Sequence, residues 1–158
     1  MFTDRIQMEP LSVAVHAVSN IAQMRANQSI AIFGCGPVGL LCMAVAKALG
    51  ASLIIAVDIV PSRVEFAVSY AATEGFLPPP FEPGEAKMAY SQRAVGLLKQ
   101  KFGVEDRGSK GLNFAIDASG AEVCVQMGIF LTKVGGTMVQ MSARILPGID
   151  KLDIEQLS

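Results

Sequence analysis

The sequence has a single histidine, no run of basic residues and no unbroken apolar stretch long enough to cross a membrane. Thirteen Lys and Arg residues against fourteen Asp and Glu give a net charge of −1, so no basic surface for nucleic acid is expected. The most apolar stretch, residues 30–46, is interrupted by glycines and a proline, whereas a membrane-spanning helix needs about 20 apolar residues. We therefore expect neither nucleic acid nor a membrane among the partners.

Cysteine is also scarce, and the three residues form no C-x-x-C pair and no cluster with histidine. We expect neither a disulfide framework nor a structural zinc site, and we expect Cys42 and Cys124 to be small core residues. His16, alone on a helix, is expected to be packed or surface-exposed rather than a metal ligand. Residues 1–5 are too polar for a secretory signal and too acidic for a transit peptide, which predicts a cytoplasmic protein.

With 158 residues, of which 51% are hydrophobic, the chain is long enough for one well-buried domain but short for two. Its mean hydropathy of +0.44 with 17% charged residues is high for a soluble monomer. We therefore expect apolar faces that a partner or a further domain covers.

Short apolar runs alternate with amphipathic stretches along the chain. The apolar runs predict strands at residues 29–33, 53–57, 112–116 and 137–141, with a stub at 76–77. Helical spacing predicts helices at residues 11–24, 40–49, 62–71, 85–102 and 121–133. This alternation predicts a doubly wound, three-layer α/β fold of the Rossmann type, with a parallel sheet in the order 3-2-1-4-5.

The same pattern predicts finer features. The core stripe of helix 11–24 should be Val13, Ala17, Ile21 and Met24, and that of helix 62–71 should be Val64, Ala67, Val68 and Ala71. Pro61 should begin its helix, and Gly135–Gly136 should stop the last one. Residues 78–84 form a proline-rich surface loop. Residues 1–141 then make one domain with an N-terminal helix, and residues 142–158 are a tail or an incomplete element.

A glycine-rich hexapeptide, Gly-Cys-Gly-Pro-Val-Gly at residues 34–39, lies between the first strand and the following helix. It fits G-x-G-x-x-G, and this strand–turn–helix context is typical of dinucleotide-binding folds. Gly34 would permit the tight turn, Gly36 the approach of a pyrophosphate, and Gly39 close packing of the helix on the strand. The alternative is a glycine turn with a purely structural role.

An acid follows at the spacing that a dinucleotide requires, because Asp58 ends the second strand 19 residues after Gly39. Its carboxylate can accept bonds from both adenosine ribose hydroxyls and repel a 2′-phosphate, so NAD is favoured over NADP. A solvated strand-end or helix-capping carboxylate is the alternative. Arg63 could lie over the adenine or reach the ribose, or be a solvated helix charge.

Five segments together resemble a known family. They are Glu9-Pro10-Leu11-Ser12-Val13, the hexapeptide with Pro37 and Val38, Val57-Asp58, residues 117–122 (Asp-Ala-Ser-Gly-Ala-Glu) and residues 135–137 (Gly-Gly-Thr). They resemble the coenzyme-binding half of zinc-dependent medium-chain polyol dehydrogenases, of the sorbitol and xylitol dehydrogenase and fungal D-xylulose reductase type. The resemblance implies oxidation of a sugar alcohol to a ketose, with hydride passing to NAD beside a catalytic zinc, and a homo-oligomer.

The resemblance also implies site residues and gaps. Ser119 and Gly120, in the turn after the fourth strand, would contact the cofactor, although Ser119 could equally cap the helix that follows. Glu9 matches a position near the family's zinc. The zinc ligands of the family precede Glu9, so no complete metal site is expected in this chain, which should be inactive alone.

These observations predict the NAD-binding portion of a polyol dehydrogenase. Two other functions use the same glycines. An S-adenosylmethionine-dependent methyltransferase also has a glycine-rich first turn and an acid after its second strand. A catalytically silent nucleotide-binding or protein-interaction module would explain the incomplete metal site.

Overall fold

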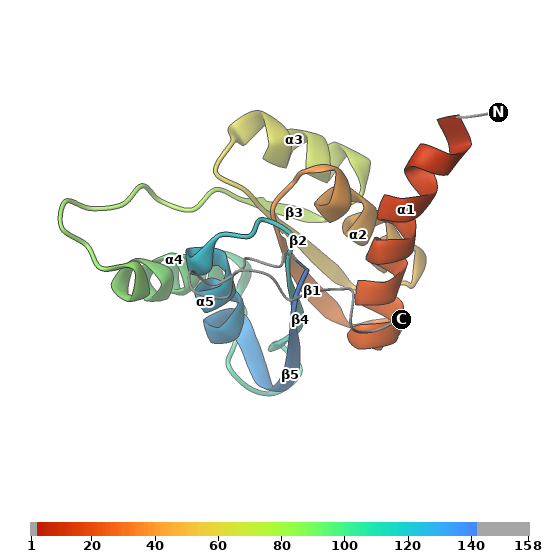
Figure 1. Cartoon of the computed structure of the whole chain (residues 1–158). Coiled ribbons are helices and arrows are strands. Elements are labelled where there is room, and N and C mark those ends of the chain that lie inside the picture. Colours follow the sequence, from red (N-terminus) through yellow and green to blue (C-terminus); the bar gives the residue numbers. More distant parts are fainter. Residues whose placement is uncertain (1–2, 142–158) are drawn as a thin grey trace, which may run out of the picture.

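A computed structural model of the chain describes residues 3–141, in which strands and helices alternate after an N-terminal helical segment (Figure 1). The strands are β1 (Ser29–Phe33), β2 (Leu53–Val57), β3 (Glu74–Phe76), β4 (Leu112–Asp117) and β5 (Thr132–Gln140). The helices are α1 (Thr3–Val15), the π-helical turn η1 (His16–Ile21), α2 (Pro37–Ala48), α3 (Pro61–Tyr70), α4 (Lys87–Phe102) and α5 (Glu122–Leu131). No helix in this part of the chain is long and apolar enough to span a bilayer.

The five strands form one sheet in the order β3-β2-β1-β4-β5, and every neighbouring pair is parallel. The predicted doubly wound topology is therefore confirmed. In the central register, Phe33 of β1 is aligned with Val57 of β2 and with Asp117 of β4. The loops that begin at residues 34, 58 and 118 consequently leave the sheet at the same edge.

Helices cover both faces of the sheet, as the predicted three layers require (Figure 1). Alternate strand residues point to opposite faces: Ile30 and Ile32 pack with α1, η1, α2 and α3, whereas Ala31 and Phe33 pack with α4 and α5. All four of these β1 side chains are fully buried. This two-sided burial explains why the strands read as continuous apolar runs rather than as alternating ones.

The predicted core stripe of the N-terminal helix is confirmed at Ala17 and Met24, which are buried, and wrong at Val13 and Ile21. Val13 and Ile21 are 43% and 50% exposed, whereas Ala14 and Val18 are fully buried. The helix widens into η1, where the Ala22 N–H donates to the Ala17 carbonyl five residues back at 2.9 Å. Ala14 and Ala22, one position after Val13 and Ile21, are buried in their place.

The last helix and strand also differ from prediction. Helix α5 ends at Leu131, and β5 begins immediately and runs through the glycine pair that was expected to stop the helix. Between Leu112 and Phe114 the pairing of β4 with β5 shifts, and Gly135 has a φ of +82°. The glycines therefore form a bulge within the strand.

Smaller boundary shifts occur elsewhere. Helix α2 begins at Pro37, three residues earlier than predicted, and α4 begins at Lys87, two residues later than predicted. Strand β3 begins two residues before the predicted stub. Pro61 does begin α3. The predicted core stripe of α3 is buried at Val64, Ala67 and Ala71, whereas Val68 is 41% exposed and does not belong to it. The predicted tail, residues 142–158, lies outside the described residues.

Candidate functional site

The turn after β1 is a position that only glycine can occupy without strain. Gly34 has a φ of +97°, and a Cβ there would lie 3.1 Å from the backbone carbon of Ala118. Its N–H donates to the Val57 carbonyl at 2.8 Å, and the Ala118 N–H donates to the Phe33 carbonyl at 2.9 Å. The loops that follow β1, β2 and β4 are thus joined at the carboxyl edge, at the point where the strand order reverses.

The other two glycines of the hexapeptide have opposite surroundings. A Cβ on Gly36 would meet no atom within 4 Å, whereas one on Gly39 would lie 1.8 Å from the Gly34 carbonyl oxygen. Gly39 therefore lets α2 pack directly on the turn, and Gly36 faces open space. Helix α2 starts at Pro37 and no side chain caps it. Its first N–H groups are thus available to an anion beside Gly36.

Asp58 organises the glycine loop as well as lining the space in front of it. Its Oδ2 accepts the Cys35 N–H at 2.8 Å, and its Oδ1 accepts the Val60 N–H at 2.9 Å. The N-cap of α3 is Val60, and no side chain caps this helix. The alternative role of Asp58 as a helix-capping carboxylate is therefore wrong. Each carboxylate oxygen can accept a further bond. Arg63, on the first turn of α3, is exposed and lines the same space.

The turn after β4 is built around a buried carboxylate. Asp117 is fully buried, and its Oδ1 accepts the Ser119 N–H at 2.9 Å, the Ser119 hydroxyl at 2.6 Å and the Gly120 N–H at 3.3 Å. The Ser119 Oγ in turn accepts the Ala121 N–H at 3.2 Å, although Ala121 is the N-cap of α5. Ser119 therefore braces the turn without occupying the capping position.

These loops surround a cleft of about 810 Å³. Gly36, Asp58 and Arg63 form one side, and Ser119, Ala121 and Cys124 another. The proline-rich segment 78–81 and Tyr90 form a third wall. The cleft thus has open space beside Gly36, which we call its open floor, together with the carboxylate of Asp58 and the guanidinium of Arg63. The other residues that line it are mainly apolar, as is usual for a small-molecule site.

The three cysteines do not supply reactive thiols. Burial, together with the charge of Asp58, raises the pKa of the Cys35 thiol to about 12, and burial alone raises the pKa of Cys42 to about 12. Burial also raises the pKa of Cys124. Cys42 is fully buried, which confirms the prediction of a core residue. Cys124 is partly buried, packs against the core and also lines the cleft, so it lies at the edge of the core.

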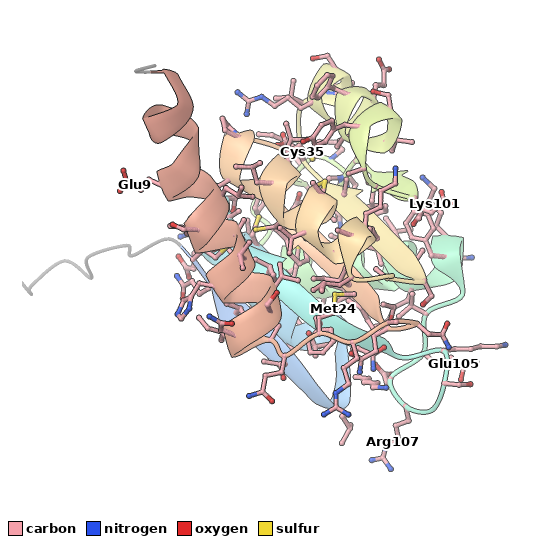
Figure 2. All side chains as sticks on the ribbon, turned by 90° about the vertical axis from the view of Figure 1, so that its right-hand side faces the viewer. Glu9, Met24, Cys35, Lys101, Glu105 and Arg107 are labelled. Carbon is pink, nitrogen blue, oxygen red and sulfur yellow. The ribbon has the colours of Figure 1, made fainter. Side chains whose placement is uncertain are left out.

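Glu9 lies apart from the cleft. Its side chain is exposed and projects from α1 away from the sheet (Figure 2). His16 is also exposed, within 3.1 Å of the Asn20 amide through its Nδ1. Within residues 3–141 no three His, Cys, Asp or Glu side chains come close enough to hold a metal ion. Zinc therefore does not fit the described residues.

Sequence reasoning missed the aromatic wall of the cleft. Phe81 stacks on Tyr90 with ring centroids 3.7 Å apart, and the Arg93 guanidinium lies 5.6 Å from the centroid of the Tyr90 ring. Tyr90 falls on the predicted helix and Phe81 follows three prolines, but only the path of the loop brings them together. The organising role of Asp117 was missed as well, because it depends on backbone geometry after the strand.

The topology and the carboxyl-edge cleft define an α/β domain of the Rossmann class. The chain belongs to the zinc-binding dehydrogenase family, since the family model described as "Zinc-binding dehydrogenase" matches residues 37–157. The "Probable D-xylulose reductase A" of Aspergillus niger is 51% identical over 133 residues, which are 84% of this chain and 34% of that protein. The namesake from Arthroderma otae is 43% identical over 137 residues, 87% of this chain and 35% of that protein. The chain thus spans about a third of the length of these relatives.

Solved structures agree with this assignment. The chain is similar to benzyl alcohol dehydrogenase from Acinetobacter calcoaceticus, with a TM-score of 0.69 and 28% identity over 94% of this chain and 36% of that one. It is also similar to alcohol dehydrogenase TADH from Thermus sp. ATN1, with a TM-score of 0.67 and 26% identity over 93% of this chain and 38% of that one.

Proposed function

We propose that this chain is the coenzyme-binding portion of an NAD-dependent polyol dehydrogenase that interconverts a sugar alcohol such as xylitol and its ketose. The observation that carries the proposal is the open floor at Gly36, between the uncapped start of α2 and the carboxylate of Asp58. The likeness to D-xylulose reductases, at 51% identity, supports the substrate class.

The cleft fits a dinucleotide, and each of its parts has a role. The first N–H groups of α2 and the bare backbone of Gly36 would hold the pyrophosphate. Asp58 would accept bonds from the ribose hydroxyls, Arg63 would lie beside them, and Ser119 would position the cofactor from the β4 side. Gly120 lies in the same turn, where its N–H donates to Asp117, but it does not line this cleft. The bound nicotinamide supplies the hydride acceptor.

A partner bearing zinc ligands would complete the enzyme. Zinc in this family would polarise the substrate oxygen, but the described residues offer no site for it. We propose that the polyol binds against such a further domain, and that the exposed apolar residues of α1 and η1, among them Leu11 and Val15, are covered in the assembly. A homo-oligomer and a cytoplasmic location belong to this proposal, the latter because all three cysteines are unpaired.

The first test compares NAD with NADP on the Asp58→Asn variant. We expect about tenfold weaker NAD binding, the value of a charged hydrogen bond, with NADP binding unchanged or tighter because repulsion of the 2′-phosphate is lost. Titration calorimetry with both cofactors measures this. An equal loss for both would mean that the substitution only disturbs the bonds from the Cys35 and Val60 N–H groups, and it would contradict the assignment of Asp58 to the ribose.

Calorimetry on the unaltered chain decides between the candidate functions. NAD is expected to bind and S-adenosylmethionine is not. Binding of S-adenosylmethionine alone would favour a methyltransferase, and binding of neither would leave a protein-interaction module.

A second expected result is negative: the 158-residue chain alone should bind NAD without oxidising xylitol or sorbitol, even with added zinc. Catalytic zinc needs about three protein ligands, and the nearest residue in the family's pattern, Glu9, stands alone and exposed. Absorbance of NADH at saturating NAD measures the rate. Zinc-stimulated turnover that Glu9→Ala abolishes would contradict the prediction.

A further inference from the structure

The proline-rich segment between β3 and α4 is built as a stiff arm. Residues 77–86 contain no helix or strand, and Figure 1 shows them as a long excursion away from the sheet before the chain returns into α4. Pro78, Pro79 and Pro80 have fixed φ angles and no N–H to pair, so this part keeps an extended shape without a neighbouring strand.

One arginine fastens the arm to α4. The Arg93 Nε and Nη2 donate to the two carboxylate oxygens of Glu85 at 2.8 and 2.7 Å, and Nη2 also donates to the Pro80 carbonyl at 2.9 Å. Glu85 itself accepts the Glu82 N–H at 3.1 Å, which folds the intervening turn. The Glu85 side chain is only 10% exposed, so this forked pair is better shielded than an ordinary surface ion pair.

The fastening holds throughout the pH range in which a dehydrogenase works. The hydrogen bond from Arg93 lowers the pKa of Glu85 to about 2, so its carboxylate stays charged.

The fastened arm places an aromatic and proline surface on the cleft. Phe81 is 50% exposed, stacks on the buried Tyr90 at an interplanar angle of 10°, and lines the cleft with Pro78 to Pro80. Asp58 and Ile59 line the same cleft. A slot with flat, apolar sides next to the ribose acceptor matches a purine in shape and polarity.

We propose that the arm 78–81, fastened by Arg93 to Glu85 and Pro80, is a positioning element that packs Phe81 against the adenine end of the dinucleotide. This inference rests on the proposed function, because it assigns the adenine end from the ribose role of Asp58. Arg93 and Glu85 act through Phe81 and do not touch the cofactor.

The absence of tryptophan from the chain gives a direct test. In Phe81→Trp the indole is the only one, and we expect its emission to fall when adenosine monophosphate or NAD saturates the chain. Nicotinamide mononucleotide should leave it unchanged. The matched control is Phe66→Trp, since Phe66 is also about half exposed and stacked on a tyrosine, Tyr70, but does not line the cleft; its emission should not respond.

The fastening is tested by Arg93→Gln in the Phe81→Trp chain. The Kd for adenosine monophosphate should rise about five- to tenfold, which is the effect expected when one face of the adenine ring loses its contact with an apolar side chain. Glu85→Gln should raise it in the same direction. Arg107→Gln is the control, because Arg107 is exposed at the end of the molecule opposite Cys35 (Figure 2), and it should leave the Kd unchanged.

The possible outcomes distinguish failure of this inference from failure of the proposed NAD-binding function. If calorimetry shows that adenosine monophosphate binds but the indole emission of the Phe81→Trp chain does not change, the arm is not the adenine wall and the proposed function stands. If calorimetry detects no binding of NAD or adenosine monophosphate to the unaltered chain, the proposed function fails and this inference fails with it. Equal affinity in the Arg93→Gln and Arg107→Gln chains would overturn the positioning role even if the emission responds.

Discussion

Gly36→Val is expected to remove NAD binding from a chain that still folds. The backbone of Gly36 has a φ of −76° and a ψ of −178°, which valine adopts readily, and no atom lies within 4 Å of its Cβ position. The new side chain therefore meets only the space that the pyrophosphate would occupy. Loss of that contact should weaken binding by about 100-fold or more, equivalent to roughly 3 kcal/mol.

Calorimetry with NAD measures the loss, and thermal unfolding measures stability. Valine is a poorer N-cap than glycine, which should cost α2 about 1 kcal/mol at most. The control is Gly96→Val, because Gly96 on α4 also has no neighbour within 4 Å of its Cβ position but does not line the cleft. That variant should bind NAD normally. Normal NAD affinity in Gly36→Val would remove the pyrophosphate from this position.

The strand order could be predicted because the signals for it are local. Each of β1, β2 and β4 is a short apolar run followed by a small or acidic residue, and parallel strands that alternate with helices admit few topologies. The placement of Gly34, Asp58 and Ser119 at one edge then follows from the register alone. When a site lies at the ends of strands, its residues can therefore be predicted from the sequence.

The parts that escaped prediction depend on local backbone geometry and loop paths that residue patterns do not determine. In the N-terminal helix Ala14 is buried and Val13 is exposed, and the adjacent apolar residues at positions 13–15 leave the buried face ambiguous in the sequence. Gly135 serves a bulge in β5, although glycines after a helical stretch usually end the helix. The aromatic wall depends on an arginine eight residues after its partner Glu85, across a loop whose path local propensity does not determine.

Gly39→Ala should have an effect on stability opposite in sign to the usual one. Replacing a helical glycine by alanine ordinarily stabilises a protein by up to about 1 kcal/mol. Here the new Cβ would lie 1.8 Å from the Gly34 carbonyl oxygen, a backbone atom of the turn that Gly34, with its φ of +97°, holds in place. Since neither backbone can move without separating α2 from β1, we expect a loss of about 3 kcal/mol or more from a total of about 5 to 15. Urea unfolding followed by circular dichroism measures it, with Gly36→Ala as the control that should unfold near the unaltered midpoint. A Gly39→Ala chain as stable as that control would show that the helix does not need its close approach to the turn.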